Sequence, residues 1–204
     1  MAVQTEGFLD RLKKLSPGKL RDQVRQSARW FRNKVKEVQG KTFPSAVKLR
    51  QQLRNDQKTT RSTPLFGRLY FYRYDAATKD KLPYWDAYPL VFPYDSWSSR
   101  NTGNNGFWGI NLHYLYLADR GLLMDVLVKG MTNNRIQISH SKVMSLIKTE
   151  KRIIPCLKKY LWKNVQGKFV EIETDEWDTA ILLPVQKFQK KSASYVYRES
   201  ASYY

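Results

Sequence analysis

Apolar and basic positions in the first third of the chain recur with the period of a helix. Between Leu20 and Val38, apolar residues return at steps of three or four, as one face of a helix requires. Ser16 and Pro17 supply a cap followed by proline at the first helical position. The pattern therefore predicts a helix over residues 17–39.

Two shorter apolar stripes flank this helix. One predicts a helix that starts after Thr5, and the other predicts a helix that starts after Pro44. Residues 55–64 hold polar residues and a proline, which is typical of a linker.

From residue 65 onward the pattern changes to short aromatic and apolar runs separated by polar turns. The runs predict strands at 69–74, 88–92, 168–173 and 179–185, and either a strand or an extended approach to a helix at 107–115. Helix-like spacing predicts helices at 118–130, 139–149 and 155–167.

This order of elements predicts an α+β fold. We expect a basic N-terminal helical arm, residues 1–63, followed by an aromatic-rich globular domain, residues 64–188. Within the domain we expect a small, curled antiparallel β-barrel of the SH3-like kind, with helices inserted between its third and fourth strands. The polar, low-complexity residues 189–204 predict an extended C-terminal tail.

The stretch from residue 69 to residue 97 holds ten aromatic side chains. Strand alternation puts Tyr70, Tyr72 and Tyr74 on one face and Leu69 and Phe71 on the other. This arrangement favours core packing. A base-stacking platform and a protein interface remain alternatives, because both also use clustered rings.

Charge adds a second strong signal. The chain carries 36 Lys and Arg against 18 Asp and Glu, for a net charge of +18 and a pI near 9.9. Residues 1–63 hold sixteen basic and five acidic residues, a net charge of +11. A field of this size attracts polyanions such as nucleic acid, an anionic membrane or an acidic protein surface.

Basic residues follow their own row beside the apolar stripe of the 17–39 helix, and further ones occur along the rest of the arm. Such a row suits sequence-nonspecific contacts to the phosphates of double-stranded DNA. A solvated basic face and an anionic membrane surface are the alternatives. The predicted phosphate contacts are Arg21, Arg25, Arg29, Arg32, Lys36, Arg50, Arg54, Lys58 and Arg61.

Candidate catalytic groups are sparse. His113 lies between apolar residues, His140 follows a predicted helix cap, and the single cysteine, Cys156, is expected to be buried. We expect the carboxylates of residues 171–178 to form a solvated acidic turn, and a metal-dependent nuclease site is the alternative. We therefore predict no enzyme activity, no cofactor and no metal site. The N-terminus lacks the apolar core of a secretory signal, and no stretch is long and apolar enough to span a membrane.

Three phrases of the sequence carry a resemblance to a known family: GRLYFYRYDAATKDKLPYWDAYPLVFP, GFWGINLHYL and the final WDTAILLPVQKF with VYRES. They resemble small basic virion proteins of T-even-like contractile-tailed bacteriophages, often labelled DNA end-protector proteins. One departure is YLYLADR, where the family pattern has a proline-bearing turn before the arginine. The matching positions are Tyr74, Asp75, Leu82, Pro83, Tyr84, Trp85, Asp86, Pro89, Leu90, Gly106, Phe107, Gly109, Asn111, Leu112, His113, Tyr114, Leu115, Trp177, Leu183, Pro184, Tyr197, Arg198 and Ser200.

The resemblance implies a virion-associated, non-enzymatic DNA-binding protein that protects the ends of packaged and injected DNA. It implies a location in the virion, and in the host cytoplasm during assembly and after injection. Other virion proteins are expected partners. The alternative is a structural component of the phage tail, baseplate or neck, in which the aromatic domain and the tail make protein contacts.

Overall fold

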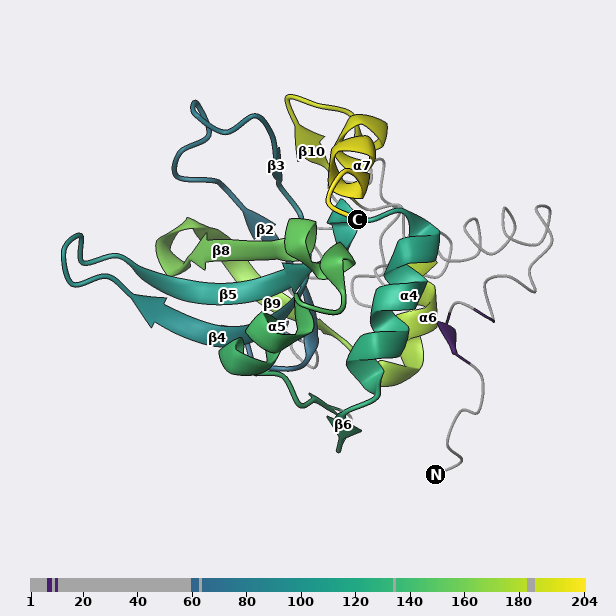
Figure 1. Ribbon diagram of the computed structural model, residues 1–204. Helices are drawn as coiled ribbons and strands as arrows, with labels where there is room; N and C mark the ends of the chain where they lie inside the picture. Colours follow the sequence, from purple (N-terminus) through teal and green to yellow (C-terminus); the bar gives the residue numbers. More distant parts are fainter. Residues whose placement is uncertain (1–6, 9, 11–59, 63, 134, 183–185) are drawn as a thin grey trace, which may run out of the picture.

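The protein is described by a computed structural model, which defines residues 7–8, 10, 60–62, 64–133, 135–182 and 186–204. The predicted arm helices at 17–39 and after Pro44 therefore lie outside the described residues, whereas Phe8 and Asp10 of the first predicted helix are described and helical. In the described part, helices and antiparallel sheets combine, which confirms the α+β class (Figure 1).

A six-stranded antiparallel sheet forms the centre of this part of the chain, in the order β1-β9-β2-β4-β5-β8. Its outer strands, β1 and β8, do not pair with each other among the described residues, so the expected closed barrel is not found there. The strands are β1 Thr60–Arg61, β9 Val165–Ile172, β2 Leu69–Tyr74, β4 Leu90–Ser98, β5 Asn105–Asn111 and β8 Leu157–Leu161.

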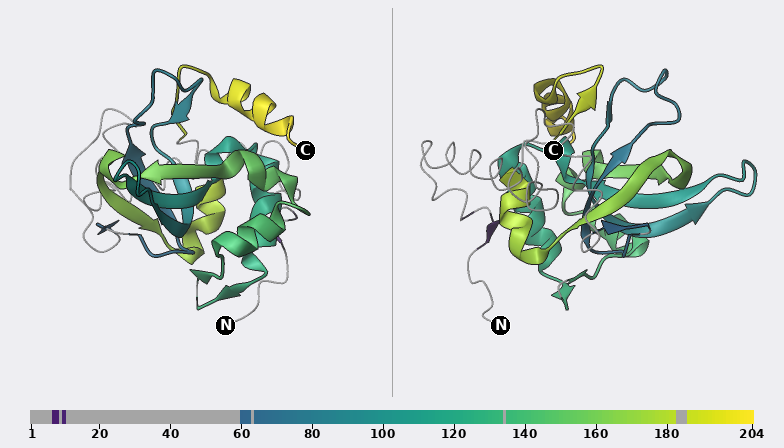
Figure 2. Two further views of the ribbon diagram at one scale, coloured as in Figure 1. Left: turned by 60° about the vertical axis from the view of Figure 1, so that its left-hand side comes forward. Right: turned by 180° about the vertical axis from the view of Figure 1, so that it is seen from behind.

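Helices and short pairs of strands surround this sheet. Helices α4 and α6 lie side by side, and α7 lies near β10 and contacts α4 through Arg120 and Tyr197 (Figures 1 and 2). The helices are α4 Leu117–Val128, α5 His140–Leu146, α6 Trp177–Leu182 and α7 Ala193–Ala201. The short strands are β3 Trp85–Asp86 with β10 Phe188–Gln189, and β6 Met131–Thr132 with β7 Arg135–Ile136. The 3-10 turns are η1 Leu112–Tyr114, η2 Lys151–Cys156, η3 Trp162–Asn164 and η4 Thr174–Glu176.

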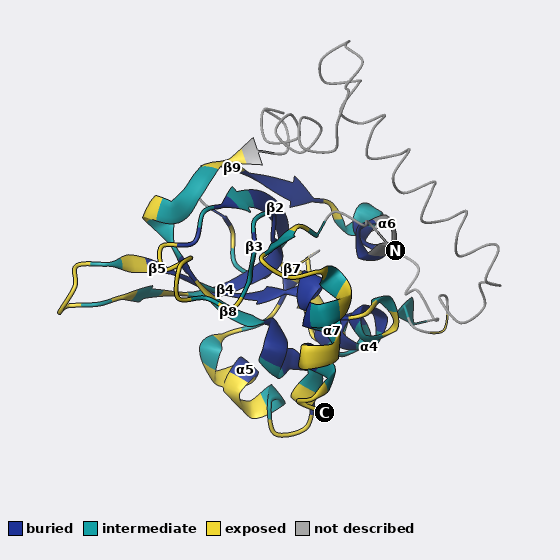
Figure 3. Ribbon diagram, turned by 90° about the horizontal axis from the view of Figure 1, so that it is seen from above, coloured by how far each residue is buried: buried dark blue, intermediate teal, exposed yellow. Residues whose placement is uncertain are grey.

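Both faces of strand β2 are buried. Leu69 and Phe71 join the cluster under the helices, whereas Tyr70 and Tyr72 join a second, aromatic cluster on the other face. The Tyr72 ring lies 4.7 Å from the ring of Phe169, centre to centre, and is fully buried. The first half of the aromatic stretch is therefore core, as the alternation indicates, and the central strands are dark in Figure 3.

Strand β5 approaches its neighbours too closely for side chains at two positions. A Cβ at Gly109 would lie 2.2 Å from Cγ1 of Val91, and a Cβ at Gly106 would lie 1.8 Å from the carbonyl oxygen of Tyr160. Glycine at these positions lets β5 pair closely with β4 and β8.

Four local expectations are corrected by the structure. The strand that was expected to end at Pro93 continues as β4, because a shift of register after Pro93 accommodates the missing N–H donor. Residues 155–167, expected to be helical, hold strand β8, which pairs with β5. Residues 179–182, expected in a strand, belong to helix α6.

The fourth correction concerns the C-terminal tail. Residues 189–204 were expected to be extended, but Ala193–Ala201 form helix α7. The Ser192 side chain caps this helix by accepting from the backbone N–H of Tyr195. Val196 and Ser200 on α7 are buried, so the helix packs on the domain.

No helix among the described residues is long and apolar enough to cross a membrane.

Candidate nucleic-acid interface

A cleft with a volume of about 540 Å³ runs along the edge strand β8. Its walls come from the 76–85 segment between β2 and β3, and from the β4–β5 hairpin. The described residues that line it are Tyr74, Ala76, Ala77, Thr78, Leu82, Pro83, Tyr84, Trp85, Asp86, Trp97, Ser99, Thr102, Asn104, Tyr114, Lys158, Lys159, Tyr160 and Leu161.

Amines lie over aromatic rings around this cleft. The Nζ of Lys159 lies 3.7 Å from the ring centre of Trp97, and the Nζ of Lys158 lies 3.7 Å from that of Tyr114. A third amine, Lys190, lies 5.8 Å from the ring centre of Trp85. Cations over ring faces are held by the ring quadrupole. The cleft thus combines flat apolar surfaces with positive charge.

Lys158 differs from an ordinary surface lysine. Burial lowers the pKa of its ammonium from 10.5 to about 8, while the nearby Cys156 and Asp86 oppose the shift. At neutral pH the amine is still mostly charged. An anion that reaches it meets a poorly hydrated cation, for which binding costs less desolvation.

The outer wall of the cleft is fixed by hydrogen bonds from distant parts of the chain. The Lys190 ammonium donates to the backbone carbonyls of Lys79 at 2.6 Å and Leu82 at 2.9 Å. At the base of the wall, Asn164 donates through Nδ2 to the carbonyl of Asp75 at 2.6 Å. These bonds tie the 76–85 segment to residues 164 and 190.

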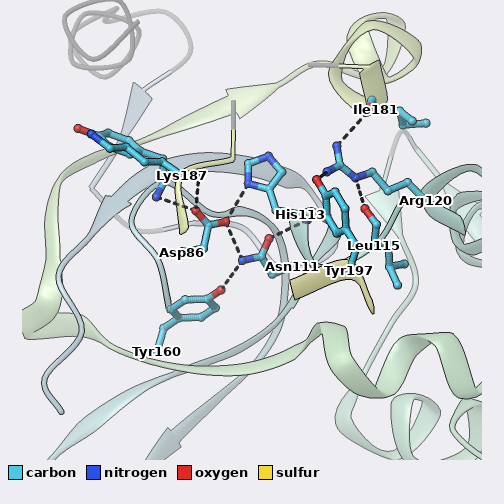
Figure 4. A network of polar contacts seen from close by, with 10 residues as sticks. Asp86, Asn111, His113, Leu115, Arg120, Tyr160, Ile181, Lys187 and Tyr197 are labelled. Atoms are coloured by element: carbon cyan, nitrogen blue, oxygen red, sulfur yellow. Dashed lines mark hydrogen bonds and ion pairs between the residues drawn. The ribbon is translucent and has the colours of Figure 1, made fainter. Parts of the chain in front are cut away.

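A buried polar network supports the floor of the cleft (Figure 4). The Asp86 carboxylate lies 2.8 Å from Nδ1 of His113 and accepts from Nδ2 of Asn111 at 3.2 Å. The same Asn111 amide donates to the Tyr160 hydroxyl at 3.2 Å. The backbone N–H of Tyr88 donates to the second carboxylate oxygen at 3.0 Å. The network thus joins β3, β5, η1 and β8.

Two opposing effects set the pKa of Asp86. Burial alone raises the pKa of the carboxyl, but the His113 ring and the hydrogen bonds from Tyr88 and Asn111 outweigh it and lower the pKa overall. The carboxylate therefore stays ionised inside the protein.

Most of the resemblance motifs gather around this network. Asp86, Asn111 and His113 form it, while Tyr74, Pro83, Tyr84 and Tyr114 line the cleft. Asp75 lies at the base of the cleft wall, and Gly109 faces Val91. Trp177 belongs to the core elsewhere: its indole N–H donates to the carbonyl of Ile172 at 3.0 Å. Pro184 lies outside the described residues.

Arg120 holds the C-terminal helix in position. Its buried guanidinium donates to the carbonyls of Leu115 at 2.9 Å and Ile181 at 3.1 Å, and to the Tyr197 hydroxyl at 3.0 Å. Burial lowers the pKa of this guanidinium, an effect that Tyr197 opposes. Sequence reasoning noted this arginine only as a departure from a pattern and missed its role.

The predicted phosphate contact at Arg61 is engaged within the protein. Its Nε lies 2.7 Å from the buried carboxylate of Glu171, which also pairs with Arg68 and accepts from the Tyr70 hydroxyl. Burial raises the pKa of Glu171, but the arginines outweigh it and lower the pKa overall. The other eight predicted contacts, Arg21 to Lys58, lie outside the described residues.

The remaining candidate groups take structural positions. Cys156 is buried, and burial raises the pKa of its thiol to about 12. Among the described residues, no group of three or more His, Cys, Asp or Glu could hold a metal ion. Lys158, Lys159 and Tyr160 were missed at the sequence level, because residues 155–167 were expected to form a helix, and Trp97 was noted only as part of the aromatic stretch.

Comparison with known families identifies the chain. Residues 5–203 match the family described as phage T4 terminal DNA protecting protein. The chain belongs to this family. The match confirms the resemblance drawn from the sequence motifs. The description of the family names protection of bacteriophage DNA ends. No curated protein and no solved structure matches the chain.

Membership in the terminal DNA protecting family allows the position of the cleft to be compared with that of the family's motif residues. The motif residues between Tyr74 and Tyr114 that are described above lie at the cleft or on the strands that build it, whereas Trp177 and Tyr197 lie elsewhere. The lysines and rings of the cleft are chemically suited to nucleic acid.

Proposed function

We propose that this protein binds the ends of linear double-stranded DNA and shields them from exonucleases without catalysing a reaction. The observation that carries the proposal is the family match over residues 5–203, whose description names terminal DNA protection. Two further features support it: a net charge of +18 and a cleft with lysines over aromatic rings.

In this proposal, contacts to the phosphates of the duplex supply most of the affinity. The basic row of the arm, Arg21 to Lys58, neutralises duplex phosphates next to the end, and the cleft engages the end itself. Six to ten such contacts make binding weaken by roughly three to five decades between 50 and 200 mM salt. No feature of the described residues is suited to reading base edges, so binding is independent of sequence.

The place of action is the virion, and the host cytoplasm during assembly and after injection. Other virion proteins are the expected neighbours. The alternative is a structural role in the tail, baseplate or neck, in which the aromatic domain and the C-terminal tail make protein contacts. Because residues 193–201 form helix α7, the tail would make such contacts with a helix and not with an extended segment.

Binding to linear and closed-circular duplexes of equal length and sequence tests the proposal. We expect tight binding to the linear form alone, at one or two proteins per molecule, with loss of affinity as salt rises. Equal affinity for both forms at every salt concentration would contradict end recognition. A matched control uses the linear duplex closed by hairpins at both ends, which keeps the phosphates but removes the free termini.

A further inference from the structure

We propose that the cleft along β8 holds one unpaired nucleotide at the DNA terminus, with its base stacked on exposed indole surface and its phosphate on Lys158 and Lys159. The inference rests on the proposed function and specifies which part of the DNA end the cleft binds. A DNA end with a short single-stranded overhang is then preferred over a blunt end.

The size of the cleft selects a single nucleotide. Its volume of about 540 Å³ lies within the range of small-molecule sites, about 300–1,000 Å³. A duplex is too bulky to enter such a space. Proteins that accept a nucleotide in a pocket of this kind take it out of the base stack first. An unpaired terminal nucleotide is already free of its partner strand, so it enters at least cost.

The rings of the cleft provide stacking surface. Trp85 and Trp97 are half-buried and both line the cleft; the Lys159 amine that lies over Trp97 has to turn aside for a base to stack there. Tyr74, Tyr114 and Tyr160 also line the cleft and are buried. Each base stacked on an aromatic side chain adds affinity without regard to sequence.

The positive charges of Lys158 and Lys159 suit the phosphate of the terminal nucleotide. Lys158 and Lys159 follow each other on β8 and both line the cleft, with their amines over Tyr114 and Trp97. An amine that lies on a ring can turn to a phosphate without leaving the cleft.

Asp86 is an acidic residue that lines the cleft, but its carboxylate does not repel a phosphate bound at Lys158 and Lys159. Asn111 and His113 contact one of its carboxylate oxygens, and the backbone N–H groups of Tyr88 and Lys187 donate to the other. The carboxylate is 3 % exposed, so its charge is turned toward the protein.

Hydrogen bonds within the chain hold the walls of the cleft. The Lys190 bonds to the 79–82 carbonyls and the Asn164 bond to Asp75 fix the outer side. The Asp86 network fixes the floor. A site that needs little ordering on binding loses less entropy and binds more tightly.

Fluorescence of 2-aminopurine at the terminal position tests the inference, because stacking quenches this base. The full-length protein is titrated into duplexes that carry 2-aminopurine as one unpaired 3′ nucleotide, as one unpaired 5′ nucleotide, or in the terminal pair of a blunt end. We expect quenching of an unpaired base, and affinity higher than for the blunt end by roughly five- to 150-fold.

Three cleft variants and one control accompany the wild type. Trp97→Ala should abolish the quenching and the overhang preference, whereas Trp97→Phe should keep part of both. Lys159→Ala should reduce the slope of log affinity against log salt by about 0.7 for the overhang. Lys148→Ala, an exposed lysine outside the cleft lining, is the matched control and should leave quenching and preference unchanged.

The outcomes separate this inference from the function on which it rests. Protection of linear DNA without quenching or overhang preference would overturn the cleft assignment and leave end protection standing. Failure to bind or protect any linear duplex would overturn both. Absence of quenching, together with failure of the Trp97→Ala protein to enter phage particles, would assign the cleft to a virion protein and overturn the inference.

Discussion

The Asp86 carboxylate and the His113 ring meet at 2.8 Å inside the protein, although 27 positions separate them in the chain. Both side chains are almost fully buried. Their contact ties the short strand β3 to the turn after β5. The wall and the floor of the cleft therefore share one buried polar centre.

Removing the Asp86 charge should destabilise the protein strongly. Asp86→Asn leaves the buried His113 and Asn111 without their anionic acceptor, so we expect a loss of about 3–5 kcal/mol in the free energy of unfolding. Urea unfolding followed by tryptophan fluorescence measures this loss. Asp80→Asn, an exposed carboxylate on the cleft wall, is the control. A loss below about 1 kcal/mol for Asp86→Asn would contradict a structural role.

Three paired carboxylates predict how stability depends on acid: Asp86 in the buried network, Glu171 beside Arg61 and Arg68, and Glu150 beside Arg152. Because the pKa values of Asp86, Glu150 and Glu171 are lower in the folded protein, these carboxylates stabilise it at any pH above their unfolded values, 3.8 and 4.5. That contribution is lost as the pH falls through the folded pKa values. Unfolding at pH 7, 5, 4 and 3 should show constant stability down to about 5 and a steep fall below 4. A protein whose stability rose between pH 5 and pH 3 would contradict the directions of these pKa shifts.

DNA binding should weaken as the pH rises through about 8, because the charged form of Lys158 is the one that binds phosphate. Affinity for an overhang duplex, measured between pH 7 and pH 9.5 at constant ionic strength, should fall with a midpoint near 8 in the wild type. Lys158→Met should bind more weakly at pH 7 and should lose this pH dependence. The same fall in the Lys158→Met protein would show that another group titrates.

Arg120 should anchor helix α7. Arg120→Met leaves the carbonyls of Leu115 and Ile181 unpaired at a buried site, so we expect a loss of roughly 2–5 kcal/mol in the free energy of unfolding. Tyr197→Phe removes one hydrogen bond and should lose about 0.5–1.5 kcal/mol. Limited proteolysis should cleave near residues 189–204 faster in both variants. Unchanged proteolysis of Arg120→Met would show that α7 is held by other contacts.

Gly109 and Val91 should show coupled energetics. Gly109→Ala places a Cβ 2.2 Å from Cγ1 of Val91 and should destabilise the protein by about 1–3 kcal/mol. Adding Val91→Ala makes room for the new methyl group, so the double variant should lose less than the sum of the two single losses. At Gly106 the clash is with the backbone oxygen of Tyr160, which no side-chain truncation relieves. Additive losses for Gly109→Ala and Val91→Ala would contradict the close approach of β5 to β4.

The sequence predicted the elements whose own side chains determine them. The alternation at 69–74 places β2 correctly, and the apolar spacing at 118–130 places α4, because each element buries side chains with its own period. The motif residues Asp86, Asn111 and His113 were named at the sequence level, but nothing in their spacing indicated that they meet.

Elements that depend on distant partners were predicted wrongly. Residues 157–161 have helical spacing, yet they form β8 because β5 offers an edge and its glycines allow a close approach. The polar tail forms α7 because Arg120 and the packing of Val196 hold it, and neither can be seen from the tail alone. The cleft was missed for the same reason, since its lysines lie on the mispredicted strand.

The rate at which a duplex-specific exonuclease digests a linear duplex tests the central claim most directly. The assay compares the free duplex, the duplex with wild-type protein and the duplex with the Trp97→Ala, Lys159→Ala double variant, at constant salt. We predict that wild-type protein delays digestion from the ends at least tenfold, that the double variant gives much weaker protection, and that the rate of internal cleavage by an endonuclease is unchanged. Digestion at the rate of free DNA, with wild-type protein bound along the duplex, would contradict the account.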